Sequence, residues 1–545
     1  MKYTKTRRFL NLVVLTGLAL GLFGLSACQR TTTQPTPTAK PAGKSAPTAT
    51  PTVEPTAATT DYPPLKILTS FKIKSLDPVK QSFWFSEFGC AELLMKWDRD
   101  FVVKPWVLKS LEQIDDLNWR LTLRPEVTFQ NGKKLDAKAL VAMMERQLEL
   151  SSSAQANLPG ATVKATGEFE VVLTTKEPLP TVPNILASES VFPVYDAQAV
   201  EAVGQDYEKL AGSGFYTGPY QVVSLNDQAL VLERYDDYWQ GVPPLPSVTV
   251  GFVPDAQARI LAVQNGEADI AIYVPSEAQR IVAGRDDAFF VTAPNTREGV
   301  RCVLNLKTKP FDDVAVRRAF NLGIDYESIA NDVLNGVYAV ATGYYPPGFP
   351  WRVENQKTDP QLAAQLLDEA GWVMGDDGVR VKDGQPLRVV LLIYPQQPDL
   401  EPMATAMQAQ LAEIGFDIEI QSVDSISEAM KKSTVPWNAG LTFSGAISGG
   451  GATQLHRYIA SYGDRNYGGI ADADLDALIT ELSRTFDADR RTEILKQVQK
   501  IIIEEQAYQF FISHKLFPAV VSPAYRGYLP SHNWLHVTFE THPTN

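Results

Sequence analysis

Histidines are the first residues to consider for chemistry, because imidazole binds metals and moves protons near neutral pH. The chain has five of them, and His532 and His536 have the four-residue spacing of two metal ligands on one helix. The residues between them are Asn533, Trp534 and Leu535, so no Glu follows the first histidine to act as a base. We therefore interpret this pair as part of a surface tail.

Motifs for covalent or cofactor chemistry are missing from the sequence. It contains no Gly-x-Ser-x-Gly elbow, no Gly-x-x-x-x-Gly-Lys-Ser/Thr loop and no Cys-x-x-Cys pair. The glycine-rich segment 212–218 has the wrong spacing for a dinucleotide-binding turn and is interpreted as a crossover loop. We predict no enzymatic activity and no cofactor.

Aromatic residues, in contrast, are dense near predicted loops. Rings beside Gly, Pro and Ser suit a pocket that holds a small solute by apolar contact and directs a few polar groups at it. The same residues also suit a core. The set comprises Phe83, Trp84, Phe85, Trp97, Trp106, Tyr344, Tyr345, Trp351, Trp437 and Tyr458.

The N-terminus predicts export and lipidation. A cationic start precedes the apolar run Phe9–Leu22, and Leu25-Ser26-Ala27-Cys28 follows. This stretch resembles the bacterial lipobox, in which the cysteine thiol carries lipid and becomes the first residue of the mature protein. The alternative is a plain membrane anchor, but the apolar run is shorter than the ~20 residues that span a bilayer.

Residues 28–61 predict a tether. They are rich in Thr, Pro and Ala and almost free of large apolar side chains, so they cannot form a core. Such a chain spans between ~30 Å as a coil and ~100 Å as polyproline II. A globular body held close to a membrane is the expected arrangement.

The charge and cysteine content limit the partners. The formal net charge is −13, and removal of the signal peptide with its four basic residues takes it to −17. A charge of this sign argues against nucleic acid as a partner. With Cys28 lipidated, only Cys90 and Cys302 could form a disulfide, and the sequence leaves open whether they do. No later segment reaches membrane-spanning length.

The body alternates predicted strands and helices without a short repeat, which indicates an α/β protein of two or three lobes. Strands are expected at 65–68, 118–123, 170–173, 221–233, 247–253, 268–273 and 415–420. Helices are expected at 136–150, 255–265, 312–322, 326–334, 361–370, 403–414, 472–483 and 489–505.

Several segments, taken in their order along the body, resemble the extracytoplasmic solute-binding proteins of ABC transporters, in the peptide/nickel-binding group (family 5). Each segment alone is a weak signal, whereas the ordered set is specific. The segments are Pro105–Leu111, Trp119–Pro125, Val127–Gly132, Thr217–Tyr220, Tyr238-Trp239, Asn265–Ile270, Phe311–Asp325 and Ala370–Trp372.

The resemblance implies a type II periplasmic-binding-protein-like fold, with two lobes that close on a ligand about a hinge and an extra domain inserted in the first lobe. We expect residues 1–27 to be the signal peptide and 28–61 the tether. Lobe I then comprises 62–92, 212–297 and 515–545, the extra domain 93–211, and lobe II 298–514.

Ligand identity is where this sequence departs from the family's patterns. Oligopeptide binders place an Asp after a strand that follows a Trp, but the stretch from Trp437 to Ser448 has no acid. Nickel binders place an Arg in the extra domain where this chain has Glu189, which would favour a cationic group or lie exposed in a loop. His456 lies near the position of a metal-ligating histidine and supports a nickel-chelate alternative.

We therefore predict a monomeric, lipid-anchored binding component of an ABC importer, on the outer face of the cytoplasmic membrane or in the periplasm. Its partners would be oligopeptides or similar small solutes and the permease subunits. Alternatives are a metal-chelate binder of the same family, a surface-tethered hydrolase, and a receptor that signals. The predicted ligand-binding residues are Gln81, Trp84, Phe85, Glu189, Ser190, Tyr345, Trp437, Ser444 and Ser448, with lipid on Cys28 and no metal site.

Overall fold

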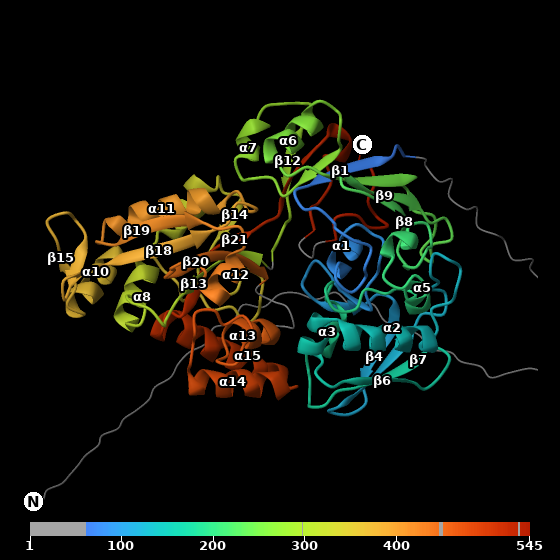
Figure 1. The fold of residues 1–545 in the computed structure, drawn as a ribbon, viewed down its shortest axis with the longest axis horizontal. Coiled ribbons are helices and arrows are strands. Elements are labelled where there is room, and N and C mark those ends of the chain that lie inside the picture. The colour runs from blue at the N-terminus through green and yellow to red at the C-terminus, as the bar shows by residue number, and fades with distance from the viewer. Residues whose placement is uncertain (1–61, 297, 446–450, 532–534, 545) are drawn as a thin grey trace, which may run out of the picture. The chain divides into compact units, whose positions relative to one another are not determined.

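The computed structural model describes residues 62–296, 298–445, 451–531 and 535–544 (Figure 1). The predicted signal peptide, Cys28, the tether, Ser448 and His532 lie outside these residues. Three large sheets organise the described chain.

The first sheet is discontinuous in sequence. Its seven strands are ordered β12-β22-β11-β1-β10-β9-β8, so strands near both chain ends lie next to strands from the middle. The strands are β1 (Leu65–Thr69), β8 (Tyr220–Leu225), β9 (Ala229–Arg234), β10 (Ser247–Phe252), β11 (Ile270–Ile272), β12 (Phe289–Thr292) and β22 (Pro518–Val521). Its helices are α1 (Ser82–Glu87), α6 (Ala256–Gln264), α7 (Ala278–Ile281) and the 3₁₀ turn η4 (Pro523–Tyr525).

The second sheet is antiparallel, in the order β4-β5-β7-β6. Strand β5 alternates as predicted, with Trp119, Leu121 and Leu123 buried. Its strands are β4 (Leu108–Gln113), β5 (Asn118–Leu123), β6 (Thr162–Ala165) and β7 (Glu170–Thr174), and β2 (Met95–Trp97) pairs with β3 (Val103–Pro105) nearby. The helices are α2 (Ala137–Leu150), α3 (Ser152–Asn157), α4 (Val182–Leu186), α5 (Ala197–Ala202) and the 3₁₀ turn η1 (Tyr207–Leu210).

The third sheet has six strands in the order β14-β21-β13-β20-β18-β19. Its strands are β13 (Glu298–Leu304), β14 (Tyr338–Val340), β18 (Arg388–Ile393), β19 (Asp417–Ser422), β20 (Ala439–Gly445) and β21 (Gln509–Lys515), with β15 (Val373–Met374), β16 (Arg380–Lys382) and β17 (Gln385–Pro386) in a small separate sheet. The helices are α8 (Val314–Leu322), α9 (Tyr326–Ser328), α10 (Pro360–Glu369), α11 (Leu400–Ala412), α12 (Ile426–Lys432), α13 (Ala452–Tyr458), α14 (Ala473–Arg484) and α15 (Ala488–Gln499), with π-helical turns η2 (Ile329–Val333) and η3 (Lys500–Glu505).

Local sequence explains many of these boundaries. An aspartate side chain accepts a backbone N–H at the start of several helices, for example Asp136 from Ala139 at 2.8 Å and Asp255 from Ala258 at 2.7 Å. Gly415 adopts φ +95° between α11 and β19, where the chain must turn out of the helix. The helix predicted at 403–414 and the strand predicted at 415–420 form as α11 and β19, and β19 pairs in parallel with β18, which precedes α11.

Gly218 allows two backbone segments to approach closely. Its N–H donates to the Cys90 carbonyl at 2.8 Å, and a Cβ at this position would lie 2.4 Å from the Gly89 oxygen and 2.5 Å from the Cys90 oxygen. Both neighbours are backbone atoms, which cannot rotate away as a side chain can.

We expect Gly218→Ala to lower the free energy of unfolding by about 2 to 3 kcal/mol, because the added methyl overpacks two chain segments. Chemical denaturation measures the change. Gly167→Ala is the matched control, since a Cβ there would meet only the Glu170 Cβ at 3.5 Å. Equal stability of the two variants would contradict this role of Gly218.

Candidate functional site

Two cavities are lined by residues that come from different sheets. The first, the Arg301 cavity, has a volume of about 300 Å³ and is lined by residues of the six-stranded sheet region together with Phe71, from the loop after β1. The residues that define it here are Phe71, Arg301, Tyr394, Thr442, Tyr458 and Arg465.

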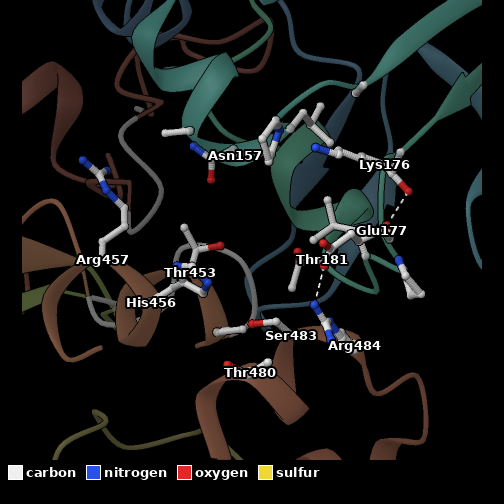
Figure 2. Close-up of a pocket in the computed structure, with 18 of the residues that line it drawn as sticks. Asn157, Lys176, Glu177, Thr181, Thr453, His456, Arg457, Thr480, Ser483 and Arg484 are labelled. Atoms are coloured by element: carbon white, nitrogen blue, oxygen red, sulfur yellow. Dashed lines mark hydrogen bonds and ion pairs between the residues drawn. The ribbon is translucent and has the colours of Figure 1, made fainter. Parts of the chain in front are cut away.

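The second, the Glu177 cavity, has a volume of about 510 Å³. One wall comes from the four-stranded sheet and its helices, and the other from α13 and α14 (Figure 2). The residues that define it here are Asn157, Lys176, Glu177, His456, Thr480 and Arg484. Both volumes fall in the range of small-solute sites.

Phe71 is the residue of the seven-stranded sheet region that lines the Arg301 cavity, and two further rings support it. The Phe71 ring lies 5.4 Å from Trp84 and 4.9 Å, edge to face, from Tyr273. Edge-to-face and tilted pairs at these distances are favourable contacts. The predicted residue Trp84 is therefore one ring removed from the cavity lining.

The opposite side of this cavity is polar and cationic. Arg301 on β13 stacks its guanidinium over the Tyr458 ring at 3.8 Å, and Arg465 donates to the Tyr458 hydroxyl at 3.0 Å. Burial raises the pKa of Tyr394 to about 12, so this hydroxyl stays protonated in the cavity wall. Asp424 is an exposed acid in the lining.

An ion pair crosses the Glu177 cavity. Arg484 of α14 donates to Glu177, which follows β7, at 2.6 Å (Figure 2). The Trp119 ring on β5 lies 6.4 Å from Phe486, so the four-stranded sheet meets the α14–α15 region at two points. His456 forms part of the wall, with its ring 4.8 Å from Tyr462.

Among the predicted site residues, those of the first loop and the four-stranded sheet region occupy different environments. Trp84 is half-buried, whereas Phe85 is fully buried against Tyr216. Gln81 precedes α1 and accepts a hydrogen bond from the Lys74 N–H. Ser190 is exposed near Ser153 and Ser188.

Glu189 is not the exposed loop acid of the simpler interpretation, because it is only 8% exposed. Its charge contributes to raising the pKa of Glu87, a rise caused mainly by burial. It lines neither of the two cavities. Its role in binding an amine stays a prediction.

The remaining predicted residues lie in the six-stranded sheet region. Tyr345 is fully buried against Tyr344 and Trp351, and Trp437 packs with Ile426 in a small core cluster. Ser444 lies on β20, opposite Gly299 of β13. Neither Tyr345 nor Trp437 lines the cavities described above.

His536 corrects the interpretation of the C-terminal histidines as a surface tail. It is 3% exposed, and its Nε2 lies 3.1 Å from a carboxylate oxygen of Glu87. The same oxygen of Glu87 accepts from the Tyr273 hydroxyl at 2.8 Å. The tertiary structure thus gives this imidazole a buried partner from α1, far away in sequence.

Sequence reasoning missed Arg301, Tyr394 and Arg465. One signal was present for Arg301, since it is a lone charge inside the apolar strand Gly299–Leu304. Cys90 and Cys302 are both buried and free, which answers the open question of a disulfide.

The described part of the chain holds neither a cluster of metal-binding side chains nor a membrane-spanning helix. No group of three or more His, Cys, Asp and Glu side chains there could hold a metal ion. No helix within the described ranges is both long enough and apolar enough to cross a bilayer.

Residues 102–456 match the family described as "Bacterial extracellular solute-binding proteins, family 5 Middle". This match covers more than half of the chain, and the chain therefore belongs to this family of solute-binding proteins. The type II periplasmic-binding-protein-like fold expected from the resemblance is confirmed, since solved structures of such proteins superpose on it.

Individual relatives differ in what they bind. The chain is 26% identical to the nickel-binding protein NikA of Staphylococcus aureus over 80% of this chain and 85% of the relative. It is 27% identical to the glutathione-binding protein GsiB of Salmonella paratyphi A over 81% and 85%, respectively. The structure of the oligopeptide-binding protein AppA of Bacillus subtilis with a nonapeptide has a TM-score of 0.72 and 22% identity, covering 88% of this chain and 98% of AppA.

Proposed function

We propose that this protein is the lipid-anchored binding component of an ABC importer and that it captures a small peptide-like solute. The observation that carries the proposal is the Arg301 cavity, because Phe71 of the seven-stranded sheet region lines it together with residues of the six-stranded sheet region. A solute held there contacts both parts, so binding stabilises their closed arrangement.

The three sheets supply the parts that such a mechanism needs. The seven-stranded sheet corresponds to lobe I, the four-stranded sheet to the extra domain and the six-stranded sheet to lobe II. In this proposal lipid on Cys28 and the 28–61 tether hold a monomeric body near the permease subunits. Solute capture involves no bond breaking, and the protein acts without enzymatic turnover.

The identity of the solute is tested by native mass spectrometry of the full chain, extracted from host membranes in mild detergent, with native and denatured masses compared. Release of a species with the mass of a short peptide supports the proposal. A metal adduct lost on chelation supports the nickel-chelate alternative instead. Hydrolysis of an added peptide by the purified protein would contradict the non-enzymatic assignment.

Trp84→Ala is expected to weaken binding of the co-purified solute about tenfold, because it removes the large ring that packs behind Phe71 in the cavity wall. Glu189→Ala is expected to weaken it only if the solute carries an amine. Titration with the released solute measures both. If neither variant changes the affinity, the predicted residues of lobe I and the extra domain do not contribute to the site.

Arg484→Ala is expected to weaken solute affinity only two- to fivefold, because the Glu177–Arg484 pair is exposed and exposed pairs contribute about 0 to 1 kcal/mol. The loss should shrink in 0.5 M salt, which screens the pair. Arg490→Ala is the control, because it removes two ion pairs, with Glu481 and Glu493, that lie within α14 and α15. An undiminished loss at high salt would show that Arg484 acts through something other than its charge.

A further inference from the structure

Arg301 differs from the other buried arginines of the described chain. Four arginines are at most 5% exposed: Arg259, Arg301, Arg317 and Arg380. A buried guanidinium is costly unless acceptors satisfy its five N–H groups. The four arginines differ in how many of their N–H groups find an acceptor within the fold.

Three of the four are satisfied by backbone carbonyls. Arg259 donates to four carbonyl oxygens at 2.6 to 3.2 Å. Arg317 donates to the carbonyls of Phe311 and Gln506, and Arg380 to those of Ile414 and Trp372, all at 2.6 to 2.9 Å. These side chains hold segments of the fold together.

Arg301 has no comparable set of acceptors. Its Nη2 lies 3.5 Å from the Thr442 hydroxyl, at the limit of a hydrogen bond, and its Nε has no partner. Burial raises the pKa of the Tyr344 hydroxyl. The positive charge of Arg301 and its hydrogen bond with Tyr344 oppose this rise. Of the residues that the structure describes, none supplies a carboxylate in an ion pair with it.

The position of Arg301 places this unsatisfied cation in a cavity. It lines the Arg301 cavity, where the Tyr458 ring beneath the guanidinium holds its plane. Arg465, at 3.0 Å from the Tyr458 hydroxyl, adds a second cation to the lining. Two acids lie near these cations. Asp424 is part of the lining but is exposed, and the negative charge of Glu298 contributes to the raised pKa of Tyr394.

We infer that the Arg301 cavity is a receptor for the carboxylate of the solute. A carboxylate matches the planar fork of a guanidinium through two parallel hydrogen bonds, which a rigid, stacked arginine presents with little loss of side-chain entropy. The missing acceptor is thus supplied by the ligand. The inference rests on the proposed solute-binding function and makes a carboxylate, rather than an amine, the anchor for recognition.

Two sources could provide this carboxylate: the C-terminus of a short peptide and a free organic acid, alone or as part of a metal chelate. The probes are a tripeptide library as free acids, the same library as C-terminal amides, citrate, and trimethyl citrate. Binding to the full chain in detergent is followed by native mass spectrometry and then by calorimetry. Peptide acids identify the first source and citrate the second.

We expect free acids to bind about a hundredfold more tightly than their amide or ester forms. Arg301→Met should remove about that factor for the acids and leave the neutral forms unchanged, while Arg301→Lys should fall between, since it keeps charge but not the fork. Arg490→Met, on the surface, should bind as wild type does.

Thermal unfolding of the unliganded protein separates a binding role from a structural one. Arg301→Met should melt no lower than wild type, because the variant removes an unsatisfied buried charge. Arg317→Met should melt well below both, because it leaves carbonyls without donors. If Arg301→Met melts as low as Arg317→Met, Arg301 is structural and the inference is overturned.

Two further outcomes distinguish the inference from the function on which it rests. Equal affinity for acids and neutral forms overturns the carboxylate receptor and leaves solute binding intact. Failure of every probe, together with absence of any co-purified solute, contradicts the proposed function and the inference with it.

Discussion

Asp399→Ala is expected to lower the free energy of unfolding by about 3 to 5 kcal/mol, because it removes the acceptor from three buried donors. Asp399 is 4% exposed and directly precedes α11, yet its side chain does not cap that helix. It accepts from the Ser276 N–H at 3.0 Å, the Ser276 hydroxyl at 2.8 Å and the Tyr338 hydroxyl at 2.9 Å.

The same carboxylate joins two sheets and compensates a buried cation. Ser276 follows β11 of the seven-stranded sheet, whereas Tyr338 begins β14 of the six-stranded one. Burial lowers the pKa of the Lys515 ammonium, and the negative charge of Asp399 opposes that fall. Loss of Asp399 therefore weakens the junction between the sheets and leaves Lys515 with less compensation.

Urea denaturation of wild type, Asp399→Ala, Ser276→Ala and the double variant measures the expected coupling between the two residues. Asp227→Ala is the matched control, since its pair with Lys72 is exposed to solvent and its loss should change stability little. A loss for Asp399→Ala no larger than for Asp227→Ala would contradict the assigned role.

The second large effect is a loss of stability in acid caused by His514. This residue lies on β21, is 1% exposed, and packs its ring 5.2 Å from Phe511. Burial lowers its pKa to about 3. In the unfolded chain the pKa of this histidine is near 6.5. Between pH 6.5 and pH 3, the unfolded chain therefore binds a proton at this position that the folded protein does not bind.

The contribution of neutral His514 to the free energy of unfolding is therefore fully present above about pH 6.5. It falls as the pH falls, by about 2 kcal/mol at pH 5. Glu92 contributes with the opposite sign, because burial raises its pKa to about 7. The measured quantity is thus the difference in pH slope between wild type and His514→Leu. The variant should show the smaller loss in acid.

His542→Leu is the control, because His542 is exposed. Urea denaturation at pH 7, 6 and 5 should give it the slope of wild type. A wild-type slope for His514→Leu as well would show that this histidine does not stay neutral in the folded protein.

Local patterns in the sequence predicted many of the longer helices and several strands, including β1, β5, β7, β10 and β11. Apolar residues at three- and four-residue spacing predicted a helix at 312–322, where α8 forms, and alternation predicted β5. Short-range signals suffice there because one face of each element meets solvent. Strands β13 and β21 are buried along their whole length, so they have no alternation to read.

The ordered family segments determined the fold and the class of protein, because glycine turns and buried positions are constrained by the fold they build. They did not locate the site. Arg301, Tyr458 and Phe71 come together only through sheet order and the approach of the loop after β1. Whether a charge is satisfied depends on acceptors that the fold brings near it, so the sequence does not show that backbone carbonyls satisfy Arg317 while the Nε of Arg301 has no partner.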